Sequence, residues 1–319
     1  MAVVAQFPLL RYYAEQNDYC NIYDMKILVP IFGLGMFLLG PLNAYLVDRY
    51  SRKNVFRNSV VGLIATTILM LFINTRLLMA ILILLQGMFF GMIQMVLGGT
   101  LINDLTISEQ RNNADYCYRW VGRIAVIMGL ALSELMVGYL NNLEYEYYVL
   151  ISLMFLGMMC VMFVYVPFRA CDKVSLFSFD RFLGLKSWKL MLMLLPSCIV
   201  VGYFLTGFFE LEKLLLFFVG VILALIIHSF YYISKKEIKI IFCFAMLVLS
   251  LVIMIFSKPE TLLNDLSFIM LALTIGLYNA SIQLKFMKLS KHCERATYQQ
   301  TYILVVFSGM CIGYIVGLL

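Results

Sequence analysis

The sequence predicts an all-α, polytopic membrane protein built from two helical bundles that repeat one architecture. Three observations support this fold class: an apolar composition, a recurrence of apolar runs long enough to cross a membrane, and basic residues placed between those runs. Hydrophobic residues make up 63% of the 319 residues and charged residues 13%, and mean hydropathy is +0.93. Soluble globular domains are roughly 45–50% apolar, so the composition excludes that class.

Ten apolar runs follow one another along the chain and are joined by short polar links. A helix needs about 20 apolar residues to cross a bilayer. The runs cover residues 27–47, 55–74, 77–102, 120–140, 147–168, 188–209, 213–233, 238–257, 266–287 and 301–319. We therefore predict ten membrane spans. Strands of a transmembrane β-barrel would be about ten residues long with alternating polarity, and the runs do not show that pattern.

Basic residues concentrate in every second link. Most of the 24 Lys and Arg residues lie in the links after the first, third, fifth, seventh and ninth runs. Because positive charge is retained on the cytoplasmic side, we predict that these links lie inside and that the protein is a multi-pass protein of the plasma (inner) membrane. The net charge of +6 then reflects orientation and contact with anionic lipid headgroups of the bilayer, and we predict no nucleic-acid partner.

The longest polar stretch divides the chain in two. Five runs precede it and five follow it, and it is basic and amphipathic. We predict an N-terminal bundle over residues 1–168, with a truncated first helix and five spans. A cytoplasmic linker over 169–187 and a C-terminal bundle of five spans over 188–319 follow. Two bundles joined in this way are typical of many secondary transporters.

Clusters that could support catalysis or bind a metal are missing from the sequence. The two histidines, His228 and His292, stand alone, and the eight cysteines contain no C-x-x-C pair. Neither an H-E-x-x-H motif nor a Walker loop is present. We therefore predict no catalytic residue, no metal site and no cofactor, and a membrane-embedded enzyme is the weakest function class. His228 lies in an apolar run and is predicted to be a core or interfacial residue.

A compact charged turn follows the first apolar run, and it consists of Asp48, Arg49, Arg52 and Lys53. A carboxylate at this boundary can pair with a neighbouring arginine or face the amides at a helix N-terminus. The turn is therefore a candidate latch between conformations. The alternative is a charged turn that only orients the protein in the membrane.

The segment AYLVDRYSRKNVF, residues 44–56, resembles the signature of the major facilitator superfamily, G-x-L-x-D-R-x-G-R-K, which links that family's second and third helices. Ala44 and Ser51 replace the two glycines, and both are small. Gly40 and Ala44, four residues apart, keep a small-residue face for helix packing. Residues 110–114 (QRNNA) are similar to the family's link between helices four and five.

This resemblance implies a secondary active transporter, a permease that moves a small solute by alternating access. It also implies that the charged turn ties the two bundles together on the cytoplasmic side and favours an outward-open state. By the family's numbering, the ten runs are helices two to eleven. Residues 1–19 would then be a remnant of helix one, and helix twelve would be missing. A truncated or non-transporting relative is therefore the alternative function.

Two family motifs differ in this chain. The helix-four arginine that stands three residues before Gln86-Gly87 is replaced by Ile83, so proton coupling through that arginine is not predicted. The Gly-Pro motif of helix five is replaced by Ser133-Glu134-Leu135. A coupling proton or ion stays a candidate partner.

Polar residues inside the runs are candidates for solute or ion binding, because unpaired polar groups are costly in hydrocarbon. They are Gln86, Gln94, Glu134, Asn279 and Gln283. The four amides lie on the family's helices four and ten, which line its pathway. They suit a neutral polar or zwitterionic solute, and interhelical hydrogen bonds are the alternative. Glu134 is predicted to be protonated, paired with Arg123 or lining a cavity.

Overall fold

The computed structural model describes residues 1–16, 22–73, 75–106, 110–140, 143–166, 175–179, 182–204, 211–233, 239–258, 261–290 and 294–317. These residues form α1 (Ala2–Gln16), α2 (Ile22–Leu38), α3 (Gly40–Tyr50), α4 (Arg52–Met70), α5 (Arg76–Gln94), the π-helical segment η1 (Met95–Leu101), α6 (Ile102–Leu105), α7 (Arg111–Leu140), α8 (Leu143–Met162), the 3₁₀ turn η2 (Leu185–Ser187), α9 (Trp188–Phe204), α10 (Leu211–Ile233), α11 (Ile240–Phe256), α12 (Leu262–Leu289) and α13 (Arg295–Gly317). Within these ranges there is no β-strand, and the all-α prediction is confirmed.

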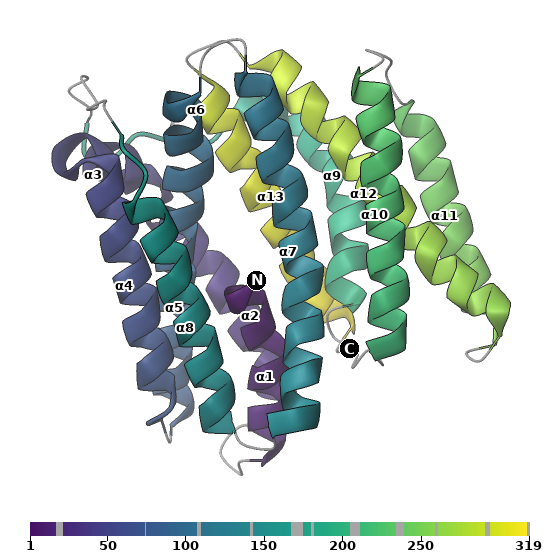
Figure 1. Cartoon of the computed structure of the whole chain (residues 1–319), viewed down its shortest axis with the longest axis horizontal. Coiled ribbons are helices and arrows are strands. Elements are labelled where there is room, and N and C mark those ends of the chain that lie inside the picture. The colour runs from purple at the N-terminus through teal and green to yellow at the C-terminus, as the bar shows by residue number, and fades with distance from the viewer. Residues whose placement is uncertain are drawn as a thin grey trace.

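The long helices lie side by side and alternate in direction along the chain (Figure 1). The C-terminal ends of α3, α6, α8, α10 and α12 all lie at the upper end of the molecule in Figure 1. Each of these ends leads into one of the links that are rich in Lys and Arg. We call this end of the molecule the basic end.

In the described part of the chain, seven helical segments are long and apolar enough to cross a membrane, and a bent pair of helices would be an eighth. The seven segments are Arg76–Gly98, Asn113–Tyr139, Glu144–Met162, Leu185–Phe204, Leu211–Tyr232, Leu262–Leu289 and Arg295–Gly317. α11 is apolar but has only 17 residues. α4 is not among the seven, because its first two turns carry Arg52, Lys53 and Arg57. The prediction of a polytopic helical membrane protein is confirmed.

Several predicted spans have different boundaries in the structure, and two of the differences affect the site. The run 27–47 is not one straight span, because it bends by 47° where α2 ends and α3 begins. The run 120–140 starts too late, since α7 begins at Arg111 and its apolar segment at Asn113. Arg119 and Arg123 therefore lie inside the span and not in the preceding link. A helix can extend past the first charge of an apolar run when that charge faces a neighbouring helix.

Helix packing repeats between the two halves of the chain. α2 packs on α5 as α10 packs on α12, α1 packs on α7 as α9 packs on α13, and α4 packs on α5 as α11 packs on α12. In the equivalent pairs α2–α5 and α10–α12, a glycine allows the two helix backbones to approach closely. A Cβ on Gly87 would lie 2.1 Å from the Phe32 carbonyl oxygen of α2, and one on Gly220 would lie 2.5 Å from the Ile269 carbonyl oxygen of α12. The two bundles are therefore pseudo-repeats.

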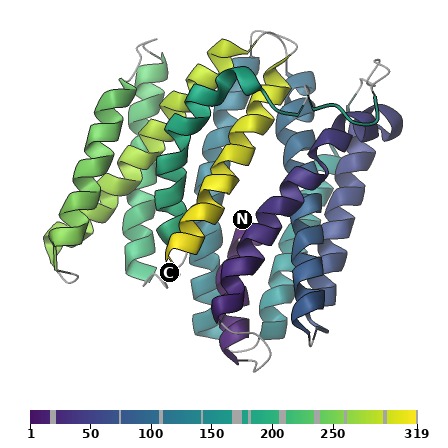
Figure 2. The ribbon, with the colours of Figure 1, turned by 180° about the vertical axis from the view of Figure 1, so that it is seen from behind.

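The bundles contact each other through α2 with α13, α7 with α10 and η1 with α13, and the first two of these pairs are equivalent in the repeat. Leu304 and Tyr314 of α13 belong to the apolar core of the first bundle. Trp120 and Ile127 of α7 belong to that of the second. Figure 2 shows α13 and α2 next to each other on the far side. The predicted boundaries at 168 and 188 stay predictions.

The linker contacts both bundles at the basic end. The Ser178 amide donates to the Pro41 carbonyl oxygen at the start of α3 over 3.1 Å. The Gly184 amide donates to Thr301 Oγ1 on α13 over 2.8 Å. A short segment of the linker therefore connects the first bundle to the second.

The stretch predicted to be a remnant of a first helix forms α1. Its residues Val3, Ala5, Leu9 and Leu10 are buried, and the helix packs against α7 and α8. Asp18 and the side chains of Arg11 and Glu15 fall outside the described part of the structure.

Candidate functional site

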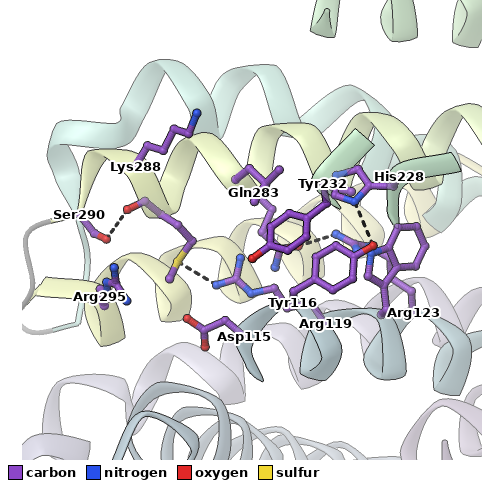
Figure 3. A pocket seen from close by; sticks show the side chains of 14 residues that line it. Asp115, Tyr116, Arg119, Arg123, His228, Tyr232, Gln283, Lys288, Ser290 and Arg295 are labelled. Atoms are coloured by element: carbon purple, nitrogen blue, oxygen red, sulfur yellow. Dashed lines mark hydrogen bonds between the residues drawn. The ribbon is translucent and has the colours of Figure 1, made fainter. Parts of the chain in front are cut away.

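A cavity of about 330 Å³ lies between α7, α10, α12 and the first turn of α13 (Figure 3). α7 belongs to the first bundle and the other three helices to the second, so the cavity lies at the interface between the bundles. The charged side chains that line it are Asp115, Arg119, Arg123, Lys288 and Arg295. In Figure 3, Lys288, Ser290 and Arg295 lie at one end, and His228 and Arg123 lie at the other.

α7 contributes its charged side chains at intervals of four residues. Asp115, Arg119 and Arg123 lie on one face of the helix, because positions i and i+4 are one turn apart. Arg123 follows Asn113, the first residue of the apolar segment, by ten positions, or about 15 Å along the axis at 1.5 Å per residue. The hydrocarbon core is about 30 Å thick. The cavity therefore extends from the basic end into the membrane-spanning segment of α7.

Arg123 connects the two bundles through neutral groups. Its Nη2 donates to Gln283 Oε1 of α12 over 2.5 Å and lies 3.4 Å from the Tyr302 hydroxyl of α13. Its guanidinium carbon lies 4.7 Å from the centre of the Trp120 ring, which is within the range of a cation–π contact. The predicted pairing of Arg123 with Glu134 stays a prediction.

Arg119 has a weak hydrogen-bond partner. Its Nη2 lies 2.9 Å from the Met287 sulfur, and a thioether is a weak acceptor. Its Nε is buried and has no hydrogen-bond partner, and the same is true of Nε in Arg295. Asp115 lies one turn before Arg119 and attracts it electrostatically. The guanidinium groups therefore retain N–H donors without strong acceptors.

An aromatic wall closes the side of the cavity that faces α10. Tyr116 stacks on Tyr232, with ring centres 4.6 Å apart, and on His228, with ring centres 5.5 Å apart. Ser229 Oγ donates to the Leu225 carbonyl oxygen. The Tyr116 hydroxyl therefore donates to Ser229 Oγ, which lies 2.7 Å away. His228, predicted to be a core or interfacial residue, is buried and lines this wall.

Of the five polar candidates, Gln283 is the one found among the lining residues of this cavity. Gln86 is buried between α5 and α4, where its Nε2 lies 3.2 Å from Thr67 Oγ1 and 3.1 Å from the Met70 sulfur. Thr67 also accepts a hydrogen bond from Gln6 of α1. The amide of Gln86 therefore holds three helices of the first bundle together.

Asn279 and Glu134 lie elsewhere. Asn279 Oδ1 accepts a hydrogen bond of 2.5 Å from Ser197 Oγ of α9, so it joins two helices of the second bundle. Glu134 is half-buried on α7. Any role of these two residues in solute or ion binding stays a prediction.

Gln94 belongs to a second polar cluster at the interface between the bundles. Its Oε1 accepts a hydrogen bond of 2.9 Å from the Tyr118 hydroxyl of α7. A Cβ on Gly98 of η1 would lie 2.8 Å from the Tyr118 ring and 3.0 Å from Gln299 Nε2 of α13. Gln299 is 2% exposed, and both of its amide atoms are buried without a hydrogen-bond partner. Three helices thus meet at Gly98 around an unpaired amide.

The charged turn lies at the basic end, between α3 and α4. Lys53 Nζ donates to the Val164 carbonyl oxygen beyond α8 over 2.9 Å. Arg49 Nη1 donates to the Tyr45 hydroxyl over 2.6 Å, and Asp48 and Arg52 are half-buried. The Lys53 contact lies within the first bundle, and a latch between the bundles stays a prediction.

Gly40 and Ala44, predicted to form a small-residue packing face, have different environments. A Cβ on Gly40 would lie 1.8 Å from the Phe182 ring of the linker, so Gly40 allows the linker to approach α3. Ala44 is half-buried on α3. Ser51, in place of a glycine of the signature, has φ 67° and ψ 149°, a backbone conformation that favours glycine.

The sequence analysis named Arg123 only as a possible partner of Glu134, and it missed Arg119 and Gln299. The arginines were counted as part of a polar link, although the pattern D-x-x-x-R-x-x-x-R predicts one charged face on a helix. Gln299 lies just before the last predicted run, and we find no signal in the sequence that would have identified it. Among the described residues, no group of three or more His, Cys, Asp or Glu side chains could hold a metal ion.

The comparisons with known proteins agree with the helix arrangement. The sequence pattern of the Major Facilitator Superfamily matches residues 9–317. A crystal structure of the nucleoside transporter NupG has a TM-score of 0.66 at 16% identity, over 99% of this chain and 87% of that chain. A bacterial homologue of the human lysosomal transporter Spinster, in an inward-facing and unoccupied conformation, has a TM-score of 0.69 at 14% identity, over 99% and 78%. A search of curated proteins finds no match. At these identities the two structures support the fold alone.

Proposed function

Because the chain belongs to the major facilitator superfamily, we propose that it is a secondary active transporter that moves a small solute by alternating access. The solute binds in the cavity between α7, α10, α12 and α13. In this proposal the basic end faces the cytoplasm, because Lys and Arg are retained on that side, and the membrane is the plasma (inner) membrane.

The location of the cavity is the observation that carries this proposal. Its walls come from both bundles, so a rocking motion of one bundle against the other changes its width. Arg123 and Gln283 face each other across it from α7 and α12. A solute that contacts both helices therefore has different contacts in each conformation, and such a difference is required for a solute to shift a conformational equilibrium.

The charged turn is proposed to act as the cytoplasmic latch. Asp48, Arg49, Arg52 and Lys53 lie at the basic end, next to the linker that connects α3 with α13. Their contacts would favour the conformation that is closed at this end. A proton or another ion is a candidate coupling partner.

Reconstitution of the purified full chain into proteoliposomes tests the proposal. We expect uptake of at least one member of a solute panel, stimulation by an imposed proton or sodium gradient, and faster uptake when the same solute is preloaded inside. Exchange of this kind distinguishes a carrier from a leak. An absence of both uptake and exchange for every solute that binds would favour the alternative of a non-transporting relative.

A further inference from the structure

We propose that the cavity selects a small organic anion, and that Arg119 and Arg123 bind its carboxylate or phosphate group. This substrate class deepens the proposed function and rests on it for the transport step. Binding of the anion does not depend on transport and can be measured alone.

The charge of the cavity lining favours an anion. Among the described residues, four cations, Arg119, Arg123, Lys288 and Arg295, line it together with one carboxylate, Asp115. Charged side chains inside a membrane are costly unless they face a polar cavity or an opposite charge. Cations of the lining outnumber its carboxylate, so the filled cavity is closer to neutrality with an anion inside.

The hydrogen-bonding of the two arginines points to the same ligand. Arg123 contacts an amide oxygen, a phenol and the face of an indole. Arg119 contacts a sulfur atom and has a buried Nε without a partner. Neither guanidinium makes a hydrogen bond to a carboxylate among the described residues. A guanidinium offers five N–H donors in a planar fork that matches the two oxygens of a carboxylate or phosphate, so both side chains retain donors for a ligand.

The spacing of the arginines suits a single oxyanion. They lie one turn apart on the same face of α7, and Figure 3 shows both of them at the cavity, with Arg123 deeper than Arg119. Lys288 and Arg295 lie at the other end of the cavity, where α12 ends and α13 begins, which is the basic end of the molecule. An anion that enters from the basic end therefore passes these two cations before it reaches Arg119 and Arg123.

Size and wall chemistry define the rest of the ligand. A volume of about 330 Å³ is near the lower limit of roughly 300–1,000 Å³ for small-molecule sites. Tyr116, Trp120 and Tyr232 supply aromatic surface beside the arginines. A compact anion with a planar body fits these features, whereas a neutral sugar would add no negative charge to a lining in which the cations outnumber the carboxylate.

A phospholipid headgroup would offer the same chemistry as a free phosphate. The experiment therefore uses full-length protein in a neutral detergent without added lipid. Thermal unfolding and calorimetry are followed with benzoate, with inorganic phosphate and with benzamide, the uncharged counterpart of benzoate. A further sample contains the anionic lipid phosphatidylglycerol.

We expect benzoate or phosphate to bind and to raise the unfolding temperature, and benzamide to have little effect. Arg119→Gln and Arg123→Gln should each weaken anion binding by roughly thirtyfold or more, the loss expected when one partner of a buried charge pair is removed. Arg123→Lys should restore part of the affinity. Lys239→Gln is the matched control, because it removes an exposed cation at the basic end outside the cavity, and it should bind anions as the wild type does.

Equal binding of benzamide and benzoate, or anion binding that survives both arginine substitutions, would overturn the proposal. Stabilisation by the anionic lipid alone would show that the site holds a headgroup, and it would overturn a solute site. Binding of a neutral solute with active exchange in proteoliposomes would reject the anion while the transport function stands. Anion binding without exchange would reject transport and retain the site.

Discussion

Arg123 of α7 and Gln283 of α12 are hydrogen-bonded across the interface between the two bundles, with 2.5 Å between Nη2 and Oε1. The acceptor is a neutral amide oxygen, and the donor is a cation ten residues into the apolar segment Asn113–Tyr139 of α7. This contact joins the bundles through a hydrogen bond rather than an ion pair. A ligand with a carboxylate can therefore offer Arg123 a stronger partner than the protein does.

Gln283→Glu tests this relationship, because it places a carboxylate of the same shape next to Arg123. We expect the new ion pair to hold the bundles together, so that transport falls about tenfold or more and anion binding weakens by a similar factor, since charge-assisted hydrogen bonds are roughly twice as strong as neutral ones. Uptake and calorimetry measure both effects. Gln110→Glu adds the same charge at an exposed position of the basic end and should leave both unchanged. Stronger anion binding in Gln283→Glu would contradict the account.

Asp48→Asn tests the proposed latch. The substitution removes a negative charge next to Arg49 and Arg52 while it keeps the size of the side chain. We expect the population that is open at the basic end to increase, as measured by distances between spin labels on the two bundles. Asp265→Asn, near the opposite end of the molecule, is the control. Identical distance distributions in Asp48→Asn and the wild type would leave the turn with an orienting role only.

Ser51→Gly should stabilise the protein. Ser51 has φ 67° and ψ 149°, and a side chain in such a region costs on the order of 1–3 kcal/mol. Glycine adopts it freely, although its extra freedom in the unfolded chain offsets about 0.5–1 kcal/mol of the gain. We expect a net stabilisation of about 1 kcal/mol, read as a higher unfolding temperature in detergent. Ser51→Ala keeps a Cβ and should show no gain; a gain of equal size in both variants would exclude backbone strain as the cause.

Gln299→Leu should raise stability and change transport. Both amide atoms of Gln299 are buried and unpaired, and an unsatisfied buried polar group costs about 1–3 kcal/mol. Leucine removes this cost at similar volume. If the amide serves the conformational cycle beside Gly98, uptake should fall while the unfolding temperature rises. A lower unfolding temperature in Gln299→Leu would show that the amide has partners in the membrane-embedded protein.

The fold could be predicted from the sequence because it depends on two patterns, each of which extends over many residues. Apolar runs and the placement of Lys and Arg are properties of whole segments, so single errors do not change the result. The bend after Leu38 was not predicted, since the apolar run continues through it without interruption. The predicted start of α7 was too late for a related reason, because Arg119 interrupts the apolar pattern while the helix continues.

The candidate site was harder to predict because it depends on which neighbour each side chain meets. Gln86 and Gln283 were equivalent in the sequence, as amides in predicted lining helices. The structure separates them, since Gln86 meets Thr67 inside the first bundle and Gln283 meets Arg123 in the cavity. Arg119 and Arg123 were not considered as ligands for a solute, because charges near the end of a run were assigned to the link.

Accessibility of a single cysteine in the cavity tests the central claim most directly. Leu284→Cys, in a background where the other cysteines are replaced, places a thiol on the cavity wall. The account predicts that a membrane-impermeant thiol reagent labels it from the cytoplasmic face and that bound anion slows the reaction. Added anion should not change labelling of an exposed cysteine placed at Lys239. Labelling that occurs only from the outer face, or that bound solute leaves unchanged, would contradict a solute cavity at the cytoplasmic end of the interface.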